Sequence, residues 1–202
     1  MPRGVARAGF TIGGILSINA IGHVGICVSD METALRFWRD GLGFEVLTDR
    51  RFRGSSWKRI LEVGELELHT RIIRRDHLML ELLEFEQPGY VGTAERSPMN
   101  RLGLTHIAVW VSDIDAVARS VVEHGGTLVE ATRTVFDHPK LKGKWLICCD
   151  PNGVRVELVE YPAGEKILER RPEGGLSHSL ESPRPIEPAA AKSGVPQQGD
   201  AS

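Results

Sequence analysis

The sequence lacks the features that define several whole classes of protein. No uninterrupted apolar stretch approaches the roughly 18 residues that a membrane-spanning helix needs. Lys and Arg number 25 against 27 Asp and Glu, a net charge of −2, so the basic excess typical of nucleic-acid and membrane-surface proteins is missing. The three cysteines, two of them adjacent, form no disulfide framework. We therefore expect a soluble, cytoplasmic protein that binds neither nucleic acid nor a membrane.

Aromatic residues are also unevenly distributed, and this divides the chain. None follows Tyr161, and five of the eleven prolines lie between Pro172 and Pro196. Such a segment buries too little apolar surface to offset the entropy lost on ordering. We predict a disordered tail over residues 163–202 and a disordered leader over residues 1–17.

The body of the chain contains an internal repeat. Ile21–Asp30 aligns with Leu104–Asp113, with matching histidines, matching apolar positions and a shared Ser-Asp ending. A helical pattern follows in each copy, over Met31–Asp40 and Ile114–Glu123, and each ends at glycines. The residues of the Ser-Asp ending are the expected helix N-caps.

Each copy continues with runs that predict strands. They are Phe44–Phe52, Lys58–Ile73 and Leu78–Phe85 in the first copy, and Thr127–Val135, Trp145–Cys149 and Val154–Tyr161 in the second. Turn residues separate these runs. The repeat therefore predicts an α+β fold of two βαβββ modules, over residues 18–85 and 102–162, joined by a linker over residues 86–101. Neither module is large enough to be comfortably stable alone.

One histidine and one glutamate stand at equivalent strand positions in each copy. His23 and Glu81 belong to the first copy, and His106 and Glu157 to the second. Each of the four lies mid-strand, in a run that otherwise favours apolar residues. Side chains alternate between the two faces of a strand, so each points to a defined face of its sheet. A carboxylate there is costly unless it is paired or binds a metal. Two imidazoles and two carboxylates suit a divalent ion such as Ni, Co, Mn, Zn or Fe. No residues are assigned to an organic cofactor.

Four stretches carry a resemblance to the vicinal oxygen chelate superfamily, which includes glyoxalase I, methylmalonyl-CoA epimerase, extradiol dioxygenases and bleomycin-binding proteins. They are GHVGICVSDMETALRFWRDGLGFEV, LMLELLEF, GLTHIAVWVSDIDAVARSVVEHGG and DPNGVRVELVEY. The resemblance implies paired modules that form a cupped mixed sheet around a metal. It also implies metal ligation by His23, Glu81, His106 and Glu157, and a homodimer in which the site lies within one chain or between two.

Three functions compete. In a glyoxalase-like isomerase or lyase, or an epimerase, Glu81 or Glu157 would move a proton next to a metal-bound carbonyl. An extradiol-type Fe(II) dioxygenase would need only His23, His106 and Glu157, with Glu81 surplus and His138 as an acid or base outside the metal's ligand set. A binding protein for a small molecule, such as an antibiotic, would use the cup without a metal.

Substrate specificity is less clearly encoded. Two arginine clusters are candidates for holding an anionic substrate or for solvated strand edges: Arg50, Arg51 and Arg53 with Trp57, and Arg71, Arg74 and Arg75. Cys27 and Trp110 share a face with the two histidines, so they are candidates for pocket walls or for ordinary packing. Asn100 and Arg101 are candidates for the rim. The Cys148-Cys149 pair is assigned no redox role.

Overall fold

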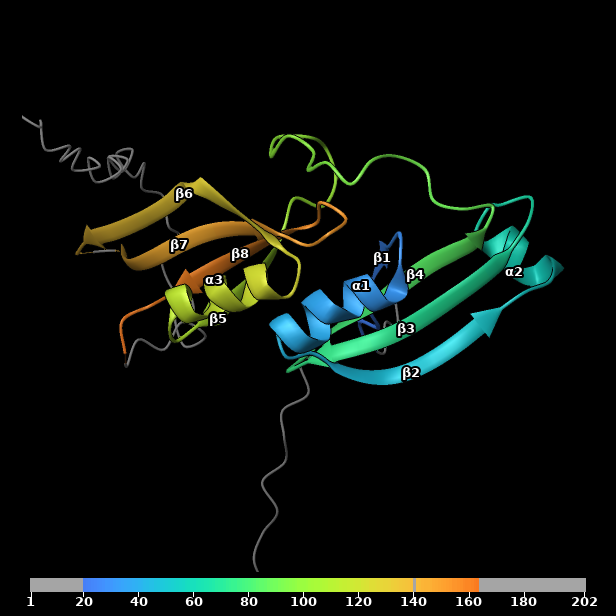
Figure 1. Ribbon diagram of the computed structural model, residues 1–202, viewed down its shortest axis with the longest axis horizontal. Helices are drawn as coiled ribbons and strands as arrows, with labels where there is room; N and C mark the ends of the chain where they lie inside the picture. Colours follow the sequence, from blue (N-terminus) through green and yellow to red (C-terminus); the bar gives the residue numbers. More distant parts are fainter. Residues whose placement is uncertain (1–19, 140, 164–202) are drawn as a thin grey trace, which may run out of the picture.

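The computed structural model describes residues 20–139 and 141–163 (Figure 1). The predicted leader and tail lie outside these residues, apart from Ala163 at the start of the tail. The first module comprises β1 (Val24–Cys27), α1 (Met31–Leu35), η1 (Arg36–Gly41), β2 (Glu45–Phe52), α2 (Ser55–Ile60), β3 (Glu67–Arg75) and β4 (Leu78–Gln87). The second comprises β5 (Ile107–Val111), α3 (Ile114–Glu123), β6 (Thr127–His138), β7 (Leu141–Cys149) and β8 (Arg155–Glu160).

Each module forms a four-stranded mixed sheet. The strand orders are β1-β4-β3-β2 and β5-β8-β7-β6, so the two sheets repeat one topology. The opening strand pairs in parallel with the closing strand, and the other pairs are antiparallel. Figure 1 shows α1 and α3 near the centre of the molecule, with β2 and β6 at the outer edges. The predicted α+β fold of two modules is confirmed.

Helix starts follow the sequence closely. The side chain of Asp30 accepts a hydrogen bond from the Thr33 N–H at 2.7 Å, and that of Asp113 accepts one from the Ala116 N–H at 2.9 Å. These are ordinary N-caps that satisfy otherwise unpaired donors. In the second module α3 spans the predicted range. In the first, the predicted helix changes after Leu35 into the wider π turn of η1.

The strand predicted to begin at Lys58 is wrong at its start. Residues 55–60 form α2, and the strand begins only at Glu67. Gly54 precedes α2 with a φ of 97°, a conformation that glycine adopts without strain. The ring of Trp57 lies 4.4 Å from that of Phe52, so α2 packs onto the end of β2. In the second module β6 and β7 extend beyond the predicted strands, to His138 and from Leu141.

The two modules share one hydrophobic core. Buried side chains of α1, η1 and α3 pack with the sheet faces that carry Ile26, Leu82 and Leu158 in a single cluster. The contact between modules is close. A Cβ at Gly126 would lie 2.5 Å from the ring of Phe37, so only glycine fits there without a shift. Neither module therefore buries its core independently of the other.

Polar contacts also cross between the modules. The Trp38 indole N–H donates to the Asp150 carboxylate at 3.3 Å, and both side chains are buried. The same carboxylate accepts from the backbone N–H groups of Asn152 and Val154, each at 2.8 Å. The Ser29 hydroxyl donates to the Asn152 side chain at 2.8 Å. Asp150 thus closes the β7–β8 turn and holds η1 of the other module.

Asp150→Ala should lower the free energy of unfolding by about 2–3 kcal/mol, because it leaves the buried Trp38 indole N–H and two part-buried backbone N–H groups without an acceptor. Asp150→Asn keeps the oxygen that the turn uses and should cost less. Burial raises the pKa of Asp150. Its contribution to stability is therefore greatest when the carboxyl is protonated, and it falls as the pH rises through the folded-state pKa.

Urea unfolding across a range of pH measures both effects. The advantage of the wild type over Asp150→Asn should shrink as the pH rises. Equal losses for the two variants at every pH would contradict this role.

Candidate functional site

The first His–Glu pair is positioned by the parallel pairing of β1 with β4. This register places Gly25 beside Glu81. His23 lies two residues before Gly25 and so projects from the same face of the sheet. The imidazole Nε2 of His23 lies 3.0 Å from the Oε2 of Glu81.

The second pair repeats this arrangement between β5 and β8. Ala108 lies beside Glu157, and His106 precedes Ala108 by two residues. The Nε2 of His106 lies 3.6 Å from the Oε2 of Glu157. Its Nδ1 lies 2.9 Å from the Thr105 hydroxyl, which leaves Nε2 as the nitrogen that faces the carboxylate.

The spacing within each pair fits two ligands of one metal ion. Donor atoms about 2.1 Å from an ion and at right angles to each other lie about 3.0 Å apart. The two observed separations are 3.0 and 3.6 Å. The 3.0 Å separation of His23 and Glu81 also suits a direct hydrogen bond, whereas the 3.6 Å separation of His106 and Glu157 is longer than one.

The chain does not gather all four side chains into one cluster. Within the described residues, the group whose donor atoms all lie within 4.8 Å of one another is a different one, His69 with Glu84 and Glu86. The predicted ligands therefore meet as two separate pairs, one per module.

Both pairs lie on sheet faces turned away from the helices, and they are accessible. The side chains of His23 and Glu81 are 41% and 21% exposed, and those of His106 and Glu157 are 33% and 26% exposed. Of the four predicted ligands, His106 helps to line a groove of about 640 Å³, together with Gly25 and Cys27 on β1 and Ala108 on β5. Small-molecule sites commonly measure about 300–1,000 Å³.

The cluster around His69 was not foreseen from the sequence. It lies on the helix side of the first sheet, where His69 is paired in register with Glu84 and Arg51. Its Nε2 lies 2.7 Å from an Asp49 carboxylate oxygen, and its Nδ1 lies 3.3 Å from one of Glu84. Only one feature of the sequence pointed to this cluster: alternation along the predicted strands allows the His69 side chain to share a sheet face with these carboxylates. Pairing across strands distant in the chain decided the rest.

His69→Leu should lower the urea midpoint at about pH 7, since it removes a partner of Asp49. The hydrogen bond from His69 is the main reason that the pKa of Asp49 lies below its usual value. Stability from such a carboxyl is present above its unfolded pKa and is lost as the pH falls through the folded pKa. The difference from wild type should therefore shrink toward about pH 3. His77→Leu, in the exposed β3–β4 turn, is the control; a difference that does not change with pH would contradict this account.

Most of the arginines considered for holding an anionic substrate form ion pairs with carboxylates of this chain. The ion pairs are Arg51 with Glu86, Arg53 with Glu67, Arg71 with Glu32 and Asp49, and Arg74 with Glu45. Arg75 donates to the Leu42 carbonyl, and Arg101 to the Ser97 hydroxyl.

Burial raises the pKa of Cys148 to about 12, so this thiol is a poor nucleophile at neutral pH.

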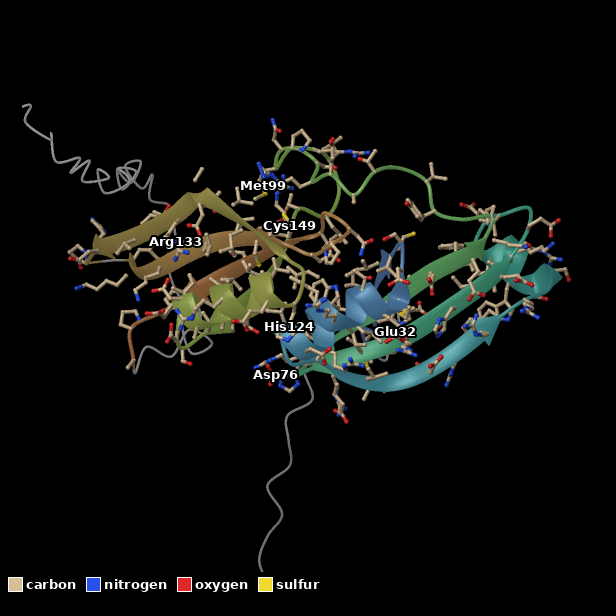
Figure 2. The ribbon with its side chains drawn as sticks, viewed as in Figure 1. Glu32, Asp76, Met99, His124, Arg133 and Cys149 are labelled. Atoms are coloured by element: carbon tan, nitrogen blue, oxygen red, sulfur yellow. The ribbon has the colours of Figure 1, made fainter. Side chains whose placement is uncertain are left out.

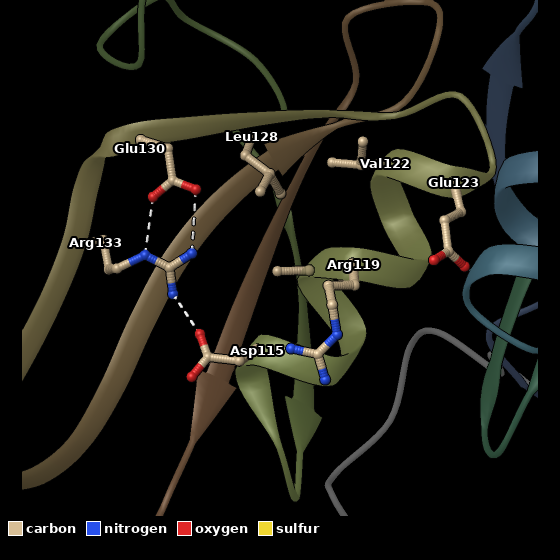
Figure 3. Close-up of a pocket in the computed structure, with 8 residues that line it drawn as sticks. Asp115, Arg119, Val122, Glu123, Leu128, Glu130 and Arg133 are labelled. Carbon is tan, nitrogen blue, oxygen red and sulfur yellow. Dashed lines mark hydrogen bonds and ion pairs between the residues drawn. The ribbon is translucent and has the colours of Figure 1, made fainter.

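A second concavity lies between α3 and β6, with a volume of about 510 Å³ (Figure 3). The Arg133 guanidinium faces both oxygens of Glu130 and also pairs with Asp115 at 2.8 Å. The positive charge of Arg133 is therefore balanced by the carboxylates of Glu130 and Asp115. Figure 2 places Arg133 in the second module and Glu32 in the first.

The comparisons with known proteins agree with the fold. The sequence model of the Glyoxalase/Bleomycin resistance protein/Dioxygenase superfamily matches residues 20–158. The chain belongs to this superfamily. A crystal structure of a glyoxalase family protein from Bacillus cereus superposes with a TM-score of 0.63 at 20% identity, covering 77% of this chain and 98% of that one.

Two named relatives are similar in sequence. A 2-epi-5-epi-valiolone epimerase from Actinomyces sp. is 27% identical over 175 residues, covering 81% of this chain and 94% of its own length. A lactoylglutathione lyase-like protein from Aspergillus terreus is 26% identical over 164 residues, covering 76% and 81%. Across residues 20–139 and 141–163, helices are all too short or too polar to span a membrane.

Proposed function

We propose that this protein is a metal-dependent isomerase, lyase or epimerase that transfers a proton next to a carbonyl group, with His23, Glu81, His106 and Glu157 as the metal ligands. The observation that carries the proposal is the duplicated His–Glu pair, found at one register position in both modules. The epimerase and lyase-like names of the two relatives support this reaction class.

The donor set suits the chemistry. Two carboxylates balance the charge of a divalent ion, and four protein ligands leave positions for substrate oxygens in octahedral coordination. When bound, the ion would stabilise negative charge developing on a substrate oxygen. Iron, nickel, cobalt, manganese and zinc are all compatible with these ligands.

The two glutamates are the proposed proton carriers. A carboxylate oxygen of Glu81 or Glu157 takes the proton from the carbon next to the carbonyl and returns it to another position. Because one glutamate comes from each module, they can act on opposite sides of a bound substrate. Removal by one and return by the other inverts a carbon centre, and return by the same residue to a neighbouring carbon isomerises the substrate.

We further propose that two chains combine to form each site. The two pairs of one chain do not cluster, whereas four ligands must converge on one ion. In a homodimer, the His23–Glu81 pair of one chain would meet the His106–Glu157 pair of its partner. Two equivalent sites would result.

Glu81→Ala should weaken metal binding by more than about 100-fold, since even residues that only support a ligand contribute about 10–100-fold. Metal content and calorimetric titration with Co²⁺ measure the effect. Glu160→Ala is the matched control: it lies on the closing strand β8, points to the face opposite Glu157, has a similar side-chain exposure of 18%, and belongs neither to a His–Glu pair nor to the His69 cluster.

The outcome also separates the reaction classes. Glu81→Ala could keep its metal content and activity while Glu157→Ala loses both. That result would favour the Fe(II) dioxygenase. Absence of metal binding by the wild type would overturn both enzyme functions and leave a binding protein.

Mixing two inactive variants tests the shared site. One carries His23→Ala with Glu81→Ala, and the other His106→Ala with Glu157→Ala. Heterodimers should regain one intact metal site, because each chain supplies the pair that the other lacks. Metal bound per dimer after mixing is the measurement. No recovery, although native mass spectrometry detects heterodimers, would place the site within a single chain.

A further inference from the structure

The sheet face that carries His106 and Glu157 also bears an exposed tryptophan. Trp110 follows Ala108 by two residues on β5, and its side chain therefore projects from the same face. The step along the strand is about 7 Å. Trp110 is 53% exposed, and among the described aromatic residues it has no ring partner.

The neighbouring strands complete an aromatic surface. Val159 on β8 lies between Trp110 on β5 and Trp145 on β7, in register with both, and is only 2% exposed. The Trp145 ring packs edge-on against Phe136 and Tyr161, with centroids 4.7 and 5.4 Å away. Val159 therefore lies buried between two indoles, that of Trp145, which packs against other rings, and that of Trp110, which does not.

The first module has no such surface at the equivalent positions. Its register places Cys27, Leu83 and Thr70 side by side across β1, β4 and β3. Cys27 stands where Trp110 stands in the second module, and Thr70 where Trp145 stands. The two walls that the proposed function brings together are thus chemically different, and only the second is aromatic.

We infer that Trp110, backed by Val159 and Trp145, is a specificity-determining residue that holds a planar aromatic group attached next to the substrate carbonyl. The inference rests on the proposed function and names its substrate class. A flat ring stacks favourably on an indole. Trp110 lies one two-residue step, about 7 Å, along the strand from Ala108, the residue beside Glu157, so a ring attached to the carbonyl would extend from the His106–Glu157 pair toward this indole.

The proposed dimer brings a second copy of the chain to this face, but Trp110 by itself is not enough to form that contact. A tryptophan side chain buries at most about 250 Å², and Trp110 already has about half of its area covered. A stable protein interface buries about 1,200 Å² or more. One indole supplies too little area for such an interface, but enough for a small ring.

Two hydroxamates test the assignment by calorimetric titration of the Co²⁺-loaded protein. Both bind a metal through neighbouring oxygens, and they differ in a phenyl or a methyl group. Benzohydroxamate should bind at least about tenfold more tightly than acetohydroxamate to the wild type, because its ring is buried against Trp110. Trp110→Ala should remove this preference without weakening acetohydroxamate, and Trp110→Phe should retain most of it.

Tyr90→Ala is the matched control, because Tyr90 is 56% exposed and lies in the linker, and it should keep the wild-type preference. Equal binding of both hydroxamates to wild type overturns the aromatic subsite and leaves the metal centre intact. If neither binds, the proposed metal centre fails and the subsite falls with it. Dissociation of a dimer by Trp110→Ala, with an unchanged hydroxamate ratio, would assign Trp110 to a contact between chains instead.

Discussion

The packing of the first module's η1 turn against the second module is the contact on which the rest of the structure depends. Phe37 fits over Gly126, and Trp38 reaches the buried carboxylate of Asp150. Side chains of α1, η1 and α3 pack together in one core that both modules share. The sheet faces opposite the helices carry both His–Glu pairs, whose side chains stay partly exposed.

The two modules have the same strand topology, but side chains at equivalent positions have different partners. Glu84 and Glu160 occupy equivalent places on the closing strands. Glu84 faces the buried His69, whereas Glu160 pairs with Lys144 at 2.7 Å and accepts the backbone N–H of Ile114 at 2.8 Å. In each module a positively charged or hydrogen-bonding group balances the carboxylate, as burial requires. The His–Glu pairs on the other face are a polar feature that both modules retain with the same partners.

A divergent repeat suits a site built from two halves. Equivalent strand positions supply similar donors, so a metal centre can form wherever two modules meet around an approximate twofold axis. The side chains one step further along the strands are free to differ, as Trp110 and Cys27 do. In the proposed function, reaction class and substrate preference would depend on different rows of the same sheets, about 7 Å apart.

The sequence by itself determined the repeated βαβββ order, the two aspartate caps and the face on which each histidine and glutamate lies. These follow from local properties, namely strand alternation and helix capping. It mistook α2 for a strand, because a short polar helix between two strands leaves no periodic signal. Only the tertiary structure decided that Trp38 meets Asp150, that His69 meets Asp49, and that the four predicted ligands stay in two pairs. Such contacts depend on strand register and on how the modules pack, which no local pattern records.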